Sequence, residues 1–269
     1  MTLPFQILST DFDGTVHAEH ENPPVPVRLQ RLIGELQRQG VTWVINTGRD
    51  LSSLMETLGR AQIPIWPDYV VTVEREIYLR DHSRYIGIDD WNARCMTAHL
   101  ELFARLRPDV PMLTEWVQAR YDATIYEDPY SPFCLIARNN GDADVIHAYL
   151  EGYCQGVPNL TIVRNDVYAR FSHADYNKGS ALAEIARRLG VDSGDIVAAG
   201  DHLNDLPMLL KRHARWLIAP GNAVPLVKEA VRQQEGYIAE ELHGFGVAAG
   251  LERIIAEHST SVCSGQSND

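Results

Sequence analysis

The sequence predicts an α/β fold, a parallel sheet with helices on both faces, interrupted by an inserted α+β domain. Short apolar runs end at acidic or glycine-bearing turns, and they alternate with segments of helical spacing. This alternation stops near residue 89 and resumes near residue 173. A length of 269 residues suffices for one large or two modest domains. We therefore expect a core formed by residues 1–88 and 173–269, with residues 89–172 as the inserted domain.

The first part of the core contains three predicted strands and two predicted helices. Three short apolar runs are typical of buried parallel strands: 5–9, 41–45 and 69–73. Between them, Leu29–Leu36 and Leu51–Leu58 carry apolar residues at helical spacing, and Gly40 provides a left-handed end for the first helix. Strands joined through helices in this order imply right-handed crossovers and a parallel sheet.

The predicted helices and strands of the inserted domain follow a different order. Its predicted elements are a helix over 91–106, alternating segments near 116–126 and over 133–138, a helix over 142–153, and strands over 160–164 and 167–171. Two helix-strand-strand units fit this pattern best, which predicts an antiparallel sheet with helices on one face. The core then resumes with a helix over 178–189 and strands over 196–199 and 216–218.

Charge and hydropathy exclude several classes of function. The formal net charge is −12, and a field of that sign repels nucleic-acid backbones and anionic membranes. The apolar runs are too short for a bilayer span, and the N-terminal segment lacks a basic region and a small-residue cleavage site. We expect a cytoplasmic protein, and we find no signal for its oligomeric state.

Polar side chains follow the predicted strands, at the carboxyl ends of the strands, where open parallel sheets bind ligands. This end of the sheet is called the sheet edge. Carboxylates gathered at that edge would repel one another unless a cation lay among them. Hard oxygen ligands select Mg²⁺, so the sequence predicts a magnesium site. The residues at this edge are Asp11 and Asp13, Thr47 and Gly48, Asp201, Asn204 and Asp205, with Lys178 at the start of the preceding helix.

The residue types suit phosphoryl chemistry. On an extended strand Asp11 and Asp13 would point to the same face, about 7 Å apart. One carboxylate can attack an electrophile while the other passes a proton to or from the leaving group. The Thr47 hydroxyl, the Gly48 N–H and the Lys178 ammonium form a donor set that fits a tetrahedral dianion. The electrophile is therefore expected to be phosphorus.

Four segments together resemble the motifs of the haloacid dehalogenase superfamily of phosphohydrolases: DFDGT (Asp11–Thr15), TGR (Thr47–Arg49), NKGSAL beginning at Asn177, and GDHLND (Gly200–Asp205). Their order and spacing match throughout, over residues 3–80 and 174–257. The insertion between the second and third motifs is similar to the Cof-type branch, which includes sugar-phosphate phosphatases and relatives of sucrose-phosphate phosphatase. The resemblance implies a Rossmann-like core and an inserted cap domain that sets substrate specificity.

The resemblance also implies roles for the matching residues. Asp11 would be the nucleophile that forms an aspartyl-phosphate, and Asp13 the general acid and then the base. Thr47, Gly48 and Lys178 would hold the phosphoryl oxygens, and Asn204 would contact the phosphate or the lysine. Magnesium would be bound by Asp11, the Asp13 carbonyl and Asp201, with Asp205 either a water-mediated partner or an orienting group.

Some positions stay open. Arg49 is either a surface partner of Asp50 or a contact to the substrate phosphate. Relatives commonly carry an asparagine and a glycine where this chain has VEREI (Val73–Ile77), which puts the local turn in doubt. His17 and His20 have the spacing of a metal pair, but they lie in a polar loop with prolines, so we expect both to be solvated.

The predicted function is that of a Mg²⁺-dependent phosphoric monoester hydrolase acting on a small phosphorylated metabolite, with a sugar phosphate as the expected class. A phosphomutase that uses the same aspartyl-phosphate is one alternative. A noncatalytic phospholigand-binding protein is another, although a binding protein would need neither the nucleophile nor the acid–base pair.

Overall fold

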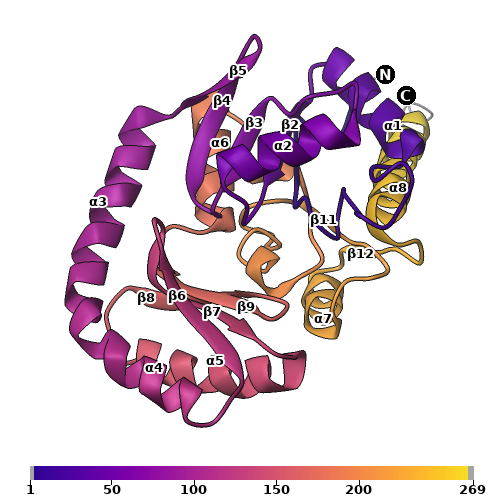
Figure 1. Cartoon of the computed structure of the whole chain (residues 1–269). Helices are drawn as coiled ribbons and strands as arrows, with labels where there is room; N and C mark the ends of the chain where they lie inside the picture. Colours follow the sequence, from indigo (N-terminus) through magenta and orange to yellow (C-terminus); the bar gives the residue numbers. More distant parts are fainter. Residues whose placement is uncertain (1–2, 266–269) are drawn as a thin grey trace. The chain divides into compact units, whose positions relative to one another are not determined.

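The computed structural model describes the backbone of residues 3–265 and the side chains of residues 3–259. The chain divides into two compact units (Figure 1). The second unit comprises Asp89–Asn177 together with His202–Asn204. The first unit comprises the remainder of the chain.

The first unit contains an eight-stranded sheet in the order β12-β11-β10-β1-β2-β3-β4-β5. Six of its strands are parallel, namely β1 (Ile7–Thr10), β2 (Thr42–Asn46), β3 (Tyr69–Thr72), β10 (Ile196–Ala199), β11 (Trp216–Ala219) and β12 (Tyr237–Ile238). The hairpin β4 (Glu76–Asp81) and β5 (Arg84–Gly87) continues the sheet in antiparallel fashion.

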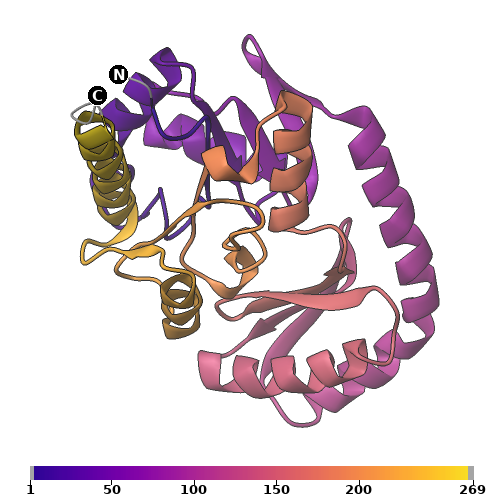
Figure 2. The same ribbon diagram turned by 180° about the vertical axis from the view of Figure 1, so that it is seen from behind.

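Helices cover both faces of this sheet. They are α1 (Val27–Arg38), α2 (Leu51–Ala61), α6 (Lys178–Leu189), α7 (Pro225–Gln233) and α8 (His243–Gly265), with a 3₁₀ turn, η2 (Ser193–Asp195). Buried residues of α1, α2 and α8 pack with one side of the strands in a single apolar cluster. Figure 1 shows α2 in front of the sheet, and α6 lies in front in the reverse view of Figure 2. The predicted α/β class with a parallel-sheet core is therefore confirmed.

The central strand β1 is where the strand order reverses. β1 pairs with β2 on one side and with β10 on the other, both in parallel register. The chain therefore proceeds outward in one direction through β2 and β3 and in the other through β11 and β12. In such sheets the crevice beyond the carboxyl ends of the strands at the reversal is the expected ligand site.

The second unit is an antiparallel sheet packed on helices. Its strands β6 (Ala123–Asp128), β7 (Ser131–Ala137), β8 (Leu160–Asn165) and β9 (Tyr168–His173) lie in the order β6-β7-β9-β8. Its helical elements are α3 (Asp89–Leu106), the 3₁₀ turns η1 (Arg107–Asp109) and η3 (Leu203–Asp205, shared with the first unit at Asp205), α4 (Val110–Gln118) and α5 (Asn140–Cys154). Inward-facing strand residues and the apolar sides of α3, α4 and α5 form one core.

One prediction in this unit is wrong. We expected an alternating, strand-like segment beginning near Trp116, but Trp116 lies on α4. Leu113 and Val117 are four residues apart and both are buried, which is helical spacing. The apolar content of this stretch was ambiguous, and a helix buries the Leu113–Val117 side against the sheet core.

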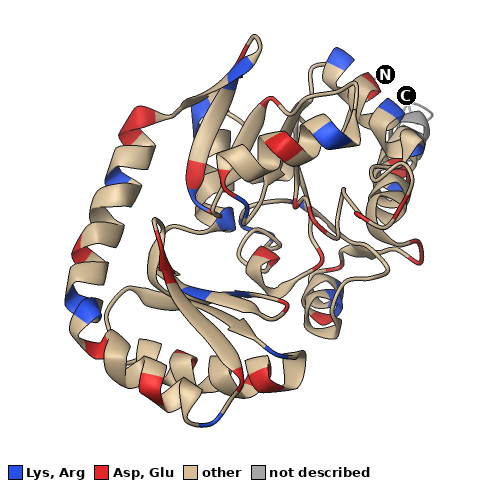
Figure 3. Cartoon of the chain, in the orientation of Figure 1, with Lys and Arg blue, Asp and Glu red and all other residues tan. Residues whose placement is uncertain are grey.

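Two surface properties bear on partners. Among residues 3–265, no helix is both long and apolar enough to cross a lipid bilayer. The excess of acidic residues is spread over many elements, and Figure 3 shows Asp and Glu interspersed with Lys and Arg along α3.

We expect the loss in free energy of unfolding on replacing a leucine by alanine to depend on whether the leucine is buried in the core. Leu8 of β1 is fully buried, so Leu8→Ala should lower the free energy of unfolding by about 3 kcal/mol, because it removes apolar contacts and leaves a cavity. Leu226 of α7 is 65% exposed, so Leu226→Ala should cost less than about 0.5 kcal/mol. Urea unfolding followed by circular dichroism measures both values, and equal costs would contradict the assigned packing.

Candidate active site

Three carboxylates converge beyond the ends of β1 and β10. Asp11 follows β1 directly, and its N–H donates to the Ala199 carbonyl at the end of β10 (2.9 Å). Asp201 and Asp205 follow β10 in the next turn. One ligand oxygen from each of these three residues lies within 4.8 Å of the others. Groups about 190 residues apart in the sequence are thus neighbours because their two strands are paired.

Lys178, at the first position of α6, lies among these carboxylates. Its Nζ donates to Asp11 Oδ1 and to Asp205 Oδ1, each at 2.6 Å, and the side chain is fully buried. Burial alone would lower the pKa of Lys178, but the charges of Asp11 and Asp205 raise it above its ordinary value. The lysine is therefore a permanently charged group at neutral pH.

One lysine does not neutralise this group of acids. Burial, followed by the charge of Asp205, raises the pKa of Asp11 well above its usual range. The same two causes, in the same order, raise the pKa of Asp201 to about 7. These shifts are what uncompensated carboxylates at short range produce, and a divalent cation bound by their oxygens would relieve the repulsion. The donor set, all carboxylate oxygen, fits Mg²⁺.

Gly14 lets the first motif approach the fourth. Its φ is +80°, and a Cβ built at this position would come 2.5 Å from Asp201 Oδ2. The next residue, Thr15, donates its hydroxyl to Asp201 Oδ1 at 2.6 Å. Any larger residue at position 14 would displace the Asp201 carboxylate, so a glycine is required here for both conformation and space.

The second motif follows β2, the strand that pairs with β1. Thr47 is buried at the end of β2; its N–H donates to the Val71 carbonyl and its hydroxyl accepts the Arg49 N–H. The turn at Val73–Ile77, which the sequence left in doubt, forms a tight hairpin in which Val73 and Glu74 both have positive φ (43° and 68°).

That hairpin turn is fastened to the second motif. The Val73 N–H donates to the Arg49 carbonyl (2.8 Å) and the Glu74 N–H to the Thr47 carbonyl (2.9 Å). A Cβ at Gly48 would come 3.3 Å from Glu74 Oε1. Two left-handed residues that are not glycine, one of them β-branched, are costly, and these bonds compensate the strain while fixing the backbone around Gly48.

Asp13 lies in a different environment from Asp11. Its carboxylate accepts two hydrogen bonds from Arg49, Nε to Oδ2 at 2.6 Å and Nη2 to Oδ1 at 2.8 Å. Burial alone would raise the pKa of Asp13, but hydrogen bonds from His17 and Arg49 outweigh it and lower the pKa to about 2. Asp50, the other candidate partner of Arg49, instead caps α2 by accepting the Ser53 N–H.

The expectation that His17 is solvated is wrong, whereas His20 is exposed as expected. His17 is 5% exposed, stacks on Phe12 with ring centroids 4.8 Å apart, and places Nδ1 3.4 Å from Asp13 Oδ1. Phe12 anchors the loop, because its carbonyl accepts the N–H groups of Val16 and His17. The segment is polar in composition, so its sequence showed no sign that the loop packs back against the first motif.

Sequence reasoning also missed Asn222 and His243. The Gly14 carbonyl accepts Asn222 Nδ2 at 2.7 Å and lies 2.9 Å from His243 Nδ1, and Asn222 Oδ1 accepts the His243 N–H. Asn222 Nδ2 also lies 3.3 Å from Asp201 Oδ2. Asn222 follows β11 at the same sheet edge, so the rule that singled out the other residues would have found it. No comparable signal pointed to His243.

The eight residues expected at the sheet edge do not all belong to one unit. Asp11, Asp13, Thr47, Gly48, Lys178, Asp201 and Asp205 lie in the first unit. Asn204 is buried and groups with the second unit, and its contact with phosphate stays a prediction.

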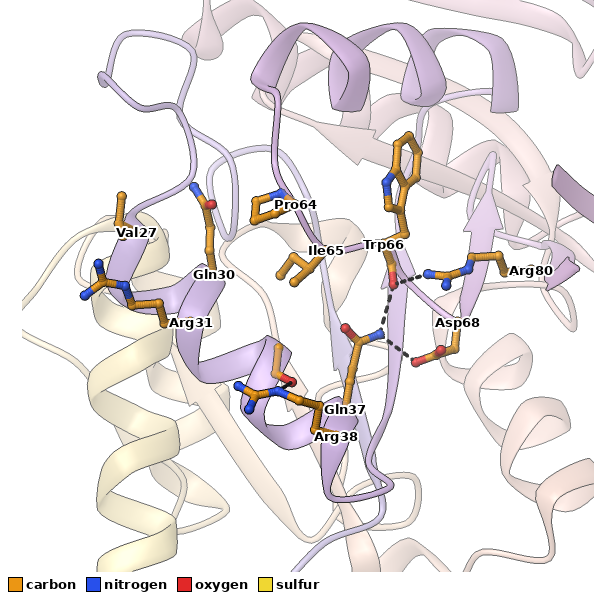
Figure 4. Close-up of a pocket in the computed structure, with 11 residues that line it drawn as sticks. Val27, Gln30, Arg31, Gln37, Arg38, Pro64, Ile65, Trp66, Asp68 and Arg80 are labelled. Atoms are coloured by element: carbon orange, nitrogen blue, oxygen red, sulfur yellow. Dashed lines mark hydrogen bonds between the residues drawn. The ribbon is translucent and has the colours of Figure 1, made fainter. Parts of the chain in front are cut away.

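A separate groove of about 610 Å³ lies beside α1 (Figure 4). It is lined by α1 and by the segment before β3, including Trp66 and Asp68. Gln37 spans it, donating to the Trp66 carbonyl and to Asp68 at 2.9 Å each. Because Asp68 precedes β3, the part of the groove that Gln37 spans is at the amino end of that strand.

Comparisons with known proteins agree with this geometry. Residues 4–110 match the sucrose-6F-phosphate phosphohydrolase family, and residues 113–242 match the haloacid dehalogenase-like hydrolase family. A phosphoglycolate phosphatase of Methanopyrus kandleri is 25% identical over 93% of this chain and 97% of its own. A 5-amino-6-(5-phospho-D-ribitylamino)uracil phosphatase of Bacillus subtilis is 23% identical over 93% of this chain and 96% of its own.

Solved structures show the same fold. The sucrose-phosphatase of Synechocystis, determined with sucrose and phosphate, superposes with a TM-score of 0.68 at 17% identity, covering 94% of this chain and 98% of that one. A haloacid dehalogenase-like hydrolase from Bacillus subtilis gives a TM-score of 0.63 at 17% identity, with 92% and 99% covered. With both parts of the sequence matching phosphatase-related families and relatives aligned over nearly their whole length, the chain is similar to the haloacid dehalogenase-like hydrolases over most of its sequence and is a phosphoric monoester hydrolase.

Proposed function

We propose that this phosphatase is Mg²⁺-dependent and hydrolyses a phosphomonoester through an aspartyl-phosphate on Asp11. The observation that supports the proposal most directly is the convergence of Asp11, Asp201 and Asp205 around Lys178. A nucleophile needs a fixed position beside groups that neutralise the phosphoryl charge, and Lys178 offers one such group.

The proposed reaction has two halves. Asp13 must carry a proton when the substrate is bound. The Asp11 carboxylate attacks phosphorus, the bond from phosphorus to the ester oxygen breaks, and Asp13 gives that oxygen its proton. Asp13 then takes a proton from a water molecule that attacks the aspartyl-phosphate, which releases phosphate and restores Asp11. Most of the catalysis of phosphoryl transfer is positioning and charge stabilisation, and acid–base assistance contributes about 10²- to 10⁴-fold.

The remaining residues hold the phosphoryl group and the cofactor. Thr47, Gly48 and Lys178 are the proposed donors to the phosphoryl oxygens, with Asn204 as a further contact. The proposed metal ligands are Asp11, the Asp13 carbonyl and Asp201, with Asp205 orienting Lys178 and the Asp201 N–H (2.8 Å). Bound magnesium would supply positive charge to the oxygens of the transferring group.

We propose a small phosphorylated metabolite, of the sugar-phosphate class, as the substrate. The relatives are named for phosphoglycolate, a phosphoribitylamino pyrimidine and a sucrose phosphate, which share a phosphomonoester on a small polar carbon skeleton. Residues 89–172 are the proposed specificity domain. A panel of sugar, polyol and carboxylate monophosphates, assayed for phosphate release with Mg²⁺ and with EDTA, tests this assignment.

Replacing the nucleophile should abolish turnover. Asp11→Asn should lower kcat by at least about 10³-fold, because the amide cannot form the acyl phosphate. The matched control is Asp192→Asn on an exposed residue, which should leave kcat unchanged. Acid-quenched wild-type enzyme should carry one phosphoryl group on the peptide containing Asp11 by mass spectrometry. Wild-type turnover by Asp11→Asn would contradict the assignment.

Magnesium should stabilise the fold through its proposed ligands, Asp11, the Asp13 carbonyl and Asp201. At 100 times its dissociation constant, a ligand specific for the native state adds about 2.7 kcal/mol, so Mg²⁺ should raise Tm by several degrees over EDTA. Asp201→Asn should lose most of this increment, whereas Asp192→Asn should keep it. Differential scanning fluorimetry measures the shift without any activity, and an unchanged increment in Asp201→Asn would exclude that residue as a ligand.

In EDTA, the stability of the protein should depend on pH through these acids. Burial and Asp205 raise the pKa of Asp201 from 3.8 to about 7, so the folded state binds more protons than the unfolded state in this window. The contribution of Asp201 to stability is therefore complete below pH 3.8 and is lost as pH rises towards 7. The difference in Tm between Asp201→Asn and wild type should grow from pH 5 to pH 8 and shrink when Mg²⁺ is added. A difference that is independent of pH would contradict the raised pKa.

A further inference from the structure

The guanidinium of Arg49 is committed to Asp13 and to α2 on all three of its nitrogens. Nε and Nη2 donate to the two carboxylate oxygens of Asp13 at 2.6 and 2.8 Å. Nη1 donates to Ser53 Oγ at 3.1 Å and to Thr57 Oγ1 at 2.9 Å. A planar fork bound to both oxygens of a carboxylate fixes the plane of that carboxylate as well as its position.

The arginine is itself held in place by rigid structure. Ser53 and Thr57 lie one turn apart on α2, and Thr57 Oγ1 also donates to the Ser53 carbonyl at 2.9 Å. Asp50 fixes the start of this helix as its N-cap. The guanidinium carbon lies 5.9 Å from the centre of the Phe12 ring, next to the stacked His17. The orientation of Asp13 is therefore set by a helix that lies outside the DFDGT loop.

We propose that Arg49 is a positioning residue for Asp13, rather than a contact to the transferred phosphoryl group. This inference rests on the proposed function of Asp13 in proton transfer. A carboxylate has about four lone-pair sites. The fork uses one on each oxygen and His17 a second on Oδ1, so a site remains on Oδ2 for the proton that is exchanged with the ester oxygen or water. With four of its five N–H donors on Asp13, Ser53 and Thr57, Arg49 acts on the reaction through the orientation of Asp13.

The two possible roles of Arg49 predict different dependence on the leaving group. An alkyl phosphate expels an alkoxide, which needs the proton from Asp13 as the P–O bond breaks. A p-nitrophenyl ester expels a stabilised phenolate that leaves without a proton. Loss of a residue that orients Asp13 should therefore lower kcat/KM for the alkyl ester and change it little for the aryl ester. Loss of a phosphate contact should lower kcat/KM equally for both esters.

The test compares kcat/KM for glycerol 1-phosphate and p-nitrophenyl phosphate at saturating Mg²⁺, because kcat/KM reports transfer to Asp11 and excludes the later hydrolysis step. Arg49→Met should lower kcat/KM for the alkyl ester about 10²-fold and for the aryl ester less than about threefold. Arg49→Lys should resemble Arg49→Met, because an ammonium supplies a charge but cannot bind both oxygens in one plane.

A second variant tests the same inference without changing any charge. Thr57→Val removes one hydroxyl that holds Nη1 and keeps the size of the side chain, so it should reproduce the ester selectivity at about three- to tenfold. The increase in Tm with Mg²⁺, measured for every variant, should stay near the wild-type value. These measurements distinguish a change in the orientation of Asp13 from a general loss of folded structure.

The outcomes are distinct. Equal losses of kcat/KM on the two esters, or recovery of alkyl-ester activity in Arg49→Lys, would overturn the positioning role and leave the phosphatase assignment intact. Failure of the wild-type protein to hydrolyse any phosphomonoester of the panel would overturn the proposed function, and this inference with it.

Discussion

The structure of the first unit depends on one electrostatic constraint, the placement of several carboxylates around a fully buried lysine at the reversal point of a parallel sheet. Pairing of β1 with β10 brings Asp11 to Asp201 and Asp205, and α6 begins with Lys178 between them. Unpaired charges in such a site are costly, so the surrounding loops must hold every partner in place. Burial of apolar strand residues supplies the stability that offsets this cost.

Loops from distant parts of the chain meet these requirements through small polar contacts. Gly14 leaves the space that Asp201 occupies, Thr15 donates to that carboxylate, and Asn222 bridges the Gly14 carbonyl to it. The turn at Val73 and Glu74 adopts the left-handed conformation without the residues that adopt it readily, because its N–H groups bind the backbone of the second motif. Backbone strain at this point is therefore coupled to the geometry of the site.

Local patterns predicted the parallel core well, because a buried strand followed by a polar turn and an amphipathic helix leaves a signal in consecutive residues. The predicted bounds of α6 and β10 agree with the structure residue for residue. Trp116 lies on a helix rather than on the expected strand, because a short apolar stretch does not distinguish a strand from a buried helix. The positions of His17 and His243 depend on contacts between loops that are distant in the sequence. The short strand β12, which precedes His243, has no recognisable strand pattern. Neither histidine could therefore be placed from local sequence.

Two aspartates only two positions apart acquire opposite electrostatic environments. Asp11 points into the buried group of acids, where burial and Asp205 raise its pKa when no cation is present, so its ionised form requires a positive partner. Asp13 turns away to the fork of Arg49, and the hydrogen bonds of His17 and Arg49 lower its pKa. The ionised form of Asp13 that this environment favours is the form that accepts a proton from water in the second half of the proposed reaction. A straight strand would direct both side chains to one face, but β1 ends at Thr10 and the backbone bends at Phe12, between the two aspartates.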